Sequence, residues 1–118
     1  EENRNKINSI IHPFFYKELN LILGESSEKR IVLELPLIET SNNIEYDFKI
    51  VSIKTNLKTR EQRYLAKPSS KAEDFIILNK YQKSSEYYEK YSDYVISNNG
   101  TIEILQTRFN KLYSKFKE

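Results

Sequence analysis

Apolar residues recur at helical spacing in the first part of the chain, from Ile7 to Leu23. Pro13 disfavours helical backbone at His12 and has no N–H to donate, so the pattern predicts a break or kink near His12 and a helix from Pro13 to Leu23. Gly24 stands where helices often end in a left-handed residue. The first segment therefore predicts an N-terminal helix with both ends marked.

Two later segments, residues 31–37 and 44–50, alternate apolar and polar positions, and a cluster of turn-forming residues at 40–43 separates them. A period of two predicts strands with one face on a core, and the turn between them makes the pair an antiparallel hairpin. The apolar phase shifts by one after Ile50, which favours a β-bulge. A third short strand at residues 63–66 would extend the hairpin to three strands.

The last part of the chain predicts two helices that fold back on each other. Residues 70–73 have the sequence of a capping box, and an apolar seam with spacings of three and four runs from there to Val95. The sequence Asn-Asn-Gly at 98–100 ends this helix, and Thr101 can cap a final one. In the alternative interpretation, residues 75–78 form a strand and a shorter helix begins at Ser84 or Ser85.

The first of these interpretations gives the class α+β. It consists of an N-terminal helix, an antiparallel β-hairpin of two or three strands, and a C-terminal αα-hairpin packed on the sheet. A length of 118 residues suits a single domain spanning 1–118. No run of about 20 apolar residues is present, so the sequence predicts no transmembrane segment.

The composition is rich in Lys, Asn, Ile, Glu and Tyr and lacks Trp, Met and Cys. This composition is typical of AT-rich bacterial genomes and of the mature parts of bacterial surface lipoproteins. The absence of cysteine excludes disulfides and thiolate chemistry. The sequence begins at Glu1 without a methionine, which indicates a processed or trimmed piece. We therefore expect the cell surface or the exterior rather than the cytoplasm.

Few residues in the chain have a type or spacing that catalysis needs. The chain contains one histidine, His12. It has only two glycines, so it holds neither a Walker loop nor a dinucleotide-binding fingerprint, each of which needs several. Glu45 and Asp47 have a separation within the range of paired catalytic carboxylates, but a solvated sheet face accounts for them without any chemistry. The sequence thus predicts no enzyme, no catalytic residue, no metal site and no cofactor.

Positive charge is concentrated in residues 52–71, where six Lys and Arg residues face a single Glu, a local charge of +5. Such a segment can bind nucleic acid or another polyanion, with Tyr64 able to stack on a base. The candidate residues for this alternative function are Lys54, Lys58, Arg60, Arg63, Tyr64 and Lys67.

Five of the nine tyrosines fall within the predicted long helix, more than one apolar seam can accommodate. Outward-facing tyrosines make good protein-binding surfaces, and the candidates are Tyr87, Tyr91 and Tyr94. We therefore expect a small non-enzymatic binding or assembly domain that recognises a protein partner. A further set of cations on the last helix is expected on its solvated outer face: Arg108, Lys111 and Lys115.

Overall fold

The computed structural model describes residues 1–116. The chain divides into two compact units, Glu1–Phe48 and Lys49–Glu118. We call them the N-terminal and C-terminal units and describe each separately. Within the described residues, no helix combines the length and the apolar character needed to cross a membrane.

The N-terminal unit consists of helix α1 (Glu2–Glu25), a 3₁₀ helix η1 (Ile38–Asn43) and the extended segments around η1. Helix α1 continues through Pro13, so the expected break near His12 is absent. Gly24 lies inside the helix without a positive φ. A Cβ at Gly24 would stand 2.5 Å from the Tyr46 hydroxyl oxygen, so close packing explains this glycine rather than a left-handed helix end.

The predicted antiparallel hairpin is wrong. Residues 31–37 and 44–50 form no strand, and the sheet instead pairs β1 (Val51–Lys54) with β2 (Tyr94–Ser97) in parallel. Alternation shows that a segment could have one buried face, but a strand exists only where a second strand satisfies its peptide groups. The expected third strand at 63–66 is also wrong, because those residues fall in or just after helix α2 (Leu57–Leu65).

The crossover between the two strands contains α2, α3 (Ala72–Lys80) and α4 (Ser85–Tyr91). A single helix from residue 71 to 95 was therefore a wrong prediction. The Ser84 side chain accepts a hydrogen bond from the Tyr87 N–H and so begins α4. The alternative interpretation was right about a helix start at Ser84 or Ser85 and wrong about a strand at 75–78, which is helical.

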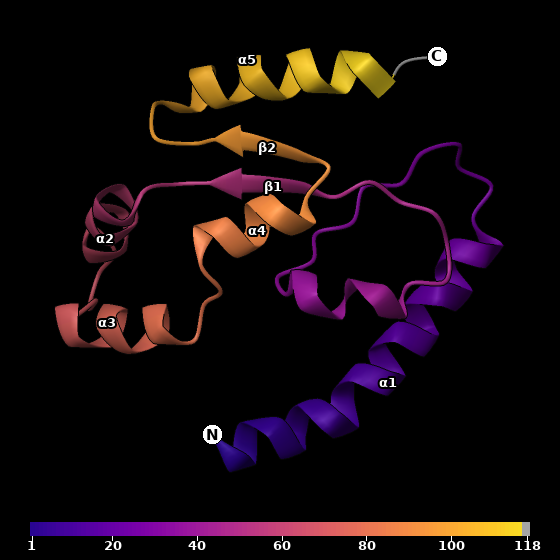
Figure 1. Cartoon of the computed structure of the whole chain (residues 1–118), viewed down its shortest axis with the longest axis horizontal. Coiled ribbons are helices and arrows are strands. Elements are labelled where there is room, and N and C mark those ends of the chain that lie inside the picture. Colours follow the sequence, from indigo (N-terminus) through magenta and orange to yellow (C-terminus); the bar gives the residue numbers. More distant parts are fainter. Residues whose placement is uncertain (117–118) are drawn as a thin grey trace. The chain divides into compact units, whose positions relative to one another are not determined.

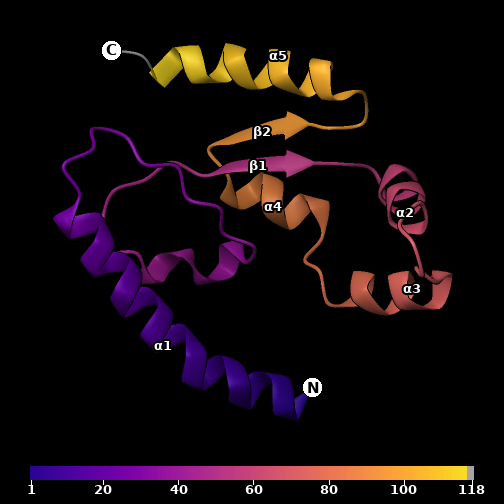
Figure 2. The same ribbon diagram turned by 180° about the vertical axis from the view of Figure 1, so that it is seen from behind.

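Helix α5 (Ile102–Tyr113) follows β2 and leads into a short 3₁₀ turn, η2 (Ser114–Phe116). Thr101 caps α5 as expected. Because β2 precedes this helix, the predicted αα-hairpin is wrong and residues 98–100 join a strand to a helix. Figure 1 shows α5 alongside β2 and α4 alongside β1, and Figure 2 shows the same arrangement from behind. Parallel strands joined through helices belong to the α/β class.

Residues from both strands and from α5 hold the C-terminal unit together. Ile96 and Leu112 are its buried apolar side chains, and the Tyr94 ring packs edge-to-face on Phe116 with centroids 5.3 Å apart. At the start of the sheet, the Asp93 carboxylate accepts the Ile50 N–H at 2.8 Å. This bond lowers the pKa of the Asp93 carboxyl below its ordinary value, so the charged form helps to align the two strands.

Candidate functional site

The carboxyl ends of β1 and β2 lie side by side, because parallel strands run in the same direction. The residues that follow each strand are joined directly. Thr55 Oγ1 donates to the Asn98 carbonyl oxygen at 3.2 Å, and the Asn56 N–H donates to Asn99 Oδ1 at 2.8 Å. In open α/β sheets, ligands bind in the crevice beyond these strand ends. We call residues 55–56 and 98–100 the carboxyl-edge loops.

Helix α2 begins at these loops. The Asn56 side chain accepts the Thr59 N–H at 2.8 Å and caps the helix. In the same helix, the Arg63 guanidinium donates from Nη1 to the Asn98 carbonyl at 2.9 Å and from Nη2 to the Gly100 carbonyl at 3.0 Å. The planar fork of arginine suits two parallel acceptors, so Arg63 fixes α2 against the loop after β2.

Helices α2 and α3 pack against each other beyond the strand ends, as both ribbon views show (Figures 1 and 2). Arg60 Nη1 donates to Asn79 Oδ1 at 3.0 Å, while Arg60 Nε is buried without a partner among the described residues. The rings of Tyr64 and Phe75 lie 5.5 Å apart. The turn between the helices contains Ser69 with φ 62°, a left-handed conformation.

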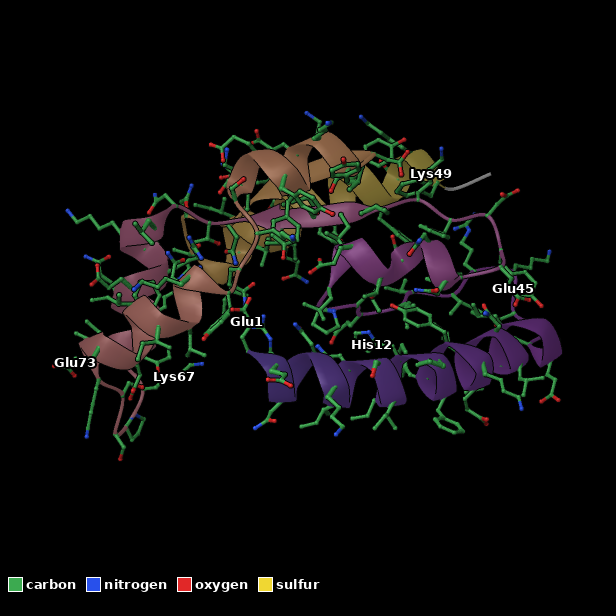
Figure 3. All side chains as sticks on the ribbon, turned by 60° about the horizontal axis from the view of Figure 1, so that its bottom comes forward. Glu1, His12, Glu45, Lys49, Lys67 and Glu73 are labelled. Carbon is green, nitrogen blue, oxygen red and sulfur yellow. The ribbon has the colours of Figure 1, made fainter. Side chains whose placement is uncertain are left out.

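Of the six residues predicted to bind a polyanion, the structure brings four together on α2: Lys58, Arg60, Arg63 and Tyr64. Lys67 follows at the turn beyond α2, and Figure 3 shows it at the same end of the C-terminal unit as Glu73 of α3. Lys58 and Lys67 are exposed. They are therefore available to an anionic ligand at this end of the unit.

Lys54, the sixth residue of that set, is engaged elsewhere. Its ammonium group forms an ion pair with Glu89 of α4. The hydrogen bond from Lys54 to the Glu89 carboxylate raises the pKa of Lys54 above its ordinary value, so the lysine stays charged but is neutralised by its partner. Lys54 therefore joins β1 to α4 and is separate from the α2 cations.

The three tyrosines predicted to bind a partner lie on two elements. Tyr87 and Tyr91 are on α4 with ring centroids 4.6 Å apart, whereas Tyr94 is on β2 against Phe116. They do not share one helix, because the long helix that would have carried them does not exist. Their role in binding a protein partner stays a prediction.

The weaker chemical candidates lie in the N-terminal unit. His12 is on α1 with its ring edge-to-face to Tyr16 at 6.5 Å, and Glu45 and Asp47 follow η1 (Figure 3). Across residues 1–116, no three His, Asp or Glu side chains gather closely enough to hold a metal ion.

Sequence patterns did not identify the loop residues Asn56 and Asn98–Gly100 as part of the site. A signal was available, since the short apolar run Tyr94–Ile96 stands between Asp93 and the turn residues that begin at Asn98. A run of this kind is typical of a buried parallel strand, whose carboxyl end would then be marked by the asparagines. This strand was not predicted, because Tyr88, Tyr91 and Val95 also fit the spacing of three and four that is typical of a helix.

Comparison with known proteins gives a consistent result. The family described as CoaE, dephospho-CoA kinase, matches residues 1–103 of the chain. The dephospho-CoA kinase of Aquifex aeolicus is 32% identical over 117 residues, which cover 98% of this chain and 59% of that protein. The relative from Halalkalibacterium halodurans is 26% identical over 120 residues, covering 99% and 60%. The relative from Fusobacterium nucleatum is 31% identical over 108 residues, covering 89% and 54%.

These matches overturn three predictions from the sequence. The chain is not a non-enzymatic binding domain, the prediction of no enzyme is wrong, and so is the preference for a lipoprotein-like surface location. The first two relied on the absence of familiar catalytic motifs and the third on composition, yet the chain spans only about three-fifths of the length of the first curated relatives it matches. Because the family match covers residues 1–103, the chain belongs to the dephospho-CoA kinase family.

Proposed function

We propose that the protein containing this chain transfers a phosphoryl group from a nucleoside triphosphate to a hydroxyl group of dephospho-CoA. In this reaction an O–P bond forms at the acceptor hydroxyl, which loses its proton, and the bond from the γ-phosphorus to the nucleoside diphosphate breaks. Catalysis of such transfers consists mainly of positioning and of charge stabilisation. The chain's own contribution is therefore sought among its fixed cations.

Within the C-terminal unit, we assign the phosphate-facing role to Lys58 and Lys67. Both are exposed, and both lie on or just after α2, the helix that begins at the carboxyl-edge loops. The observation that carries this assignment is the double hydrogen bond from Arg63 to Asn98 and Gly100, because it fixes the basic helix at the strand ends. Ligands of parallel α/β sheets bind at those ends.

Arg63 and Arg60 have a positioning role in this proposal. Both arms of the Arg63 fork already hold backbone carbonyls, and Arg60 holds Asn79 of α3. They set where α2 lies and how α3 follows it. The 118 residues include only Gly24 and Gly100 as glycines, so a loop of several glycines that cradles phosphates is not assigned to them. The single domain at 1–118 likewise stays a prediction.

The test is a steady-state assay of the intact protein with ATP and dephospho-CoA. Replacing Lys67 by Gln removes a cation without changing the backbone and should lower kcat/KM by roughly 100-fold, the usual effect of losing one group that stabilises transition-state charge. Lys80→Gln is the matched control, since Lys80 is an exposed lysine in the last turn of α3. It should change kcat/KM less than about twofold.

Two results would contradict the proposal at different levels. If the intact protein does not phosphorylate dephospho-CoA, the reaction is wrong. If it does, but Lys58→Gln and Lys67→Gln each behave like Lys80→Gln, the assignment of these two lysines is wrong. An Arg63→Lys variant separates positioning from charge, because lysine keeps the charge but cannot hold both carbonyls.

A further inference from the structure

A groove of about 340 Å³ runs between β2 and α5. Its polar and charged lining comes from Tyr94 and Ser97 of the strand and from Arg108, Lys111 and Lys115 of the helix and the turn after it. The sequence predicted these three cations on a solvated outer face. They are exposed, as expected, and together with residues of the strand they line one concave surface.

The strand contributes its open edge to this groove. Tyr94 donates its N–H to the Ile50 carbonyl and Asn98 donates to the Lys54 carbonyl, so the peptide groups of these residues point toward β1. In a strand, alternate residues point to opposite edges, which directs the peptide groups of Val95 and Ser97 away from β1. The hydrogen bond from Arg108 Nη1 to the Ser97 carbonyl, 2.7 Å long, confirms this direction. The N–H groups of Val95 and Ser97 therefore lie at the groove as donors.

Positive charge in the groove is not neutralised by the chain as far as it is described. The ion pairs Lys49–Asp93 and Lys54–Glu89 both lie outside the groove. Lys115 lies over the Tyr94 ring, with its nitrogen 6.0 Å from the centroid. Three cations, two peptide donors and an aromatic ring together form a surface suited to an anion.

We propose that this groove binds a small phosphorylated molecule at a site separate from the carboxyl-edge loops. Its volume is in the range of small-ligand pockets. An acidic peptide added as a third strand fits less well, because Arg108 already occupies the Ser97 carbonyl that such a strand would need. A phosphate group needs only donors and positive charge, and the groove offers both.

Inorganic pyrophosphate is the probe for this site. The intact protein is titrated at constant ionic strength while the backbone amide signals of Val95 and Ser97 are followed by NMR. The double variant Lys111→Gln, Lys115→Gln keeps Arg108 in place and should weaken pyrophosphate binding about tenfold, as expected for two lost charge-assisted contacts. The control is Lys80→Gln with Lys83→Gln, which removes the same charge from exposed positions outside the groove and should leave the Val95 and Ser97 shifts unchanged.

Three outcomes would overturn the proposal. The first is equal loss of binding in the two double variants, which would indicate general charge attraction. The second is a set of amide shifts that sodium chloride reproduces at the same ionic strength. The third is tighter binding of a hexaglutamate peptide than of pyrophosphate, which would favour an acidic protein segment. Because the measurement is of binding, it is independent of kinase activity and of the role assigned to Lys67.

Discussion

Both units bury apolar side chains, but in the N-terminal unit polar side chains also attach the later segments to α1, whereas in the C-terminal unit a strand ladder joins the elements. The Tyr16 hydroxyl bonds Thr40, and the Asn20 side chain bonds both Asn43 and Glu45. The other unit pairs β1 with β2 and buries Ile96 and Leu112. The two units thus differ in whether a strand ladder joins their elements.

This difference shows what turns an alternating segment into a strand. Residues 31–37 have a clear period of two, yet Val32 is 80% exposed and the segment pairs with no strand among the described residues. Residues 51–54 have a weaker pattern but find a partner in residues 94–97. Hydrogen-bond satisfaction therefore decided the outcome, and hydrophobic pattern did not.

The largest expected effect tests the buried apolar side chains of the C-terminal unit. Ile96→Ala should lower the free energy of unfolding by about 3 kcal/mol, because a buried side chain leaves a cavity. Ile96 is 5% exposed, whereas Ile102 is 78% exposed. Ile102→Ala, the matched control, should stay within about 0.5 kcal/mol in the same urea titration. Equal losses in both variants would show that the side chains of β2 do not form the core.

The next effect tests the polar attachment of the N-terminal unit. Asn20→Ala removes the bond from Nδ2 to the Asn43 carbonyl and the bond from the Glu45 N–H to Oδ1, both 3.0 Å long. Two exposed hydrogen bonds should contribute about 1 to 2 kcal/mol together. Hydrogen exchange of residues 43–45 measures the loss locally. Asn3→Ala, at the exposed start of α1, is the control, and unchanged exchange at Glu45 in Asn20→Ala would refute the attachment.

A smaller effect distinguishes an observed helix cap from a predicted one. Asn56→Ala should destabilise α2 by about 1 kcal/mol, since its side chain holds the Thr59 N–H. Ser70→Ala should have almost no effect, because α3 has Lys71 as its N-cap and no side-chain cap bond. Circular dichroism during thermal unfolding compares the two. If Ser70→Ala has the larger effect, the capping box read from the sequence is right and the observed start of α3 is wrong.

The smallest effect depends on pH. The Ile50 N–H lowers the pKa of the Asp93 carboxyl, so the folded state favours the charged form more than the unfolded state does. This contribution is present above the ordinary pKa of an aspartate and is lost as pH falls through the lowered pKa of the folded state. Asp93→Asn removes the charge. The stability difference between wild type and this variant should shrink between pH 5 and pH 3, and a constant difference would exclude the charge as its source.

Local features of the sequence predicted part of the fold. The Thr101 cap and the apolar spacing from Ile102 to Leu112 gave α5, because capping and a 3.6-residue period are both local. The parallel pairing of Val51 with Tyr94 could not be predicted from local features. The two residues stand 43 positions apart, and the sequence of neither segment specifies which segment it pairs with.

The candidate site shows the same division. Positive charge can be counted along the sequence, and its density identified Lys58, Arg60, Arg63 and Lys67. The bonds from Arg63 to the carbonyls of Asn98 and Gly100 were not predictable, because every residue has a carbonyl and only the fold selects which one is reached. The family was missed because the only glycines in these residues are Gly24 and Gly100, so no glycine-rich motif pointed to it.

The separation between β1 and β2 has a consequence during protein synthesis. The ribosome releases β1 well before the segment that will pair with it, and at usual elongation rates the interval is roughly 2 to 9 s. Throughout that time Val51 and Ile53 belong to a nascent segment with unsatisfied peptide groups. Chaperone access and elongation speed across the codons for α2, α3 and α4 should therefore influence how much of the newly made chain reaches its folded state.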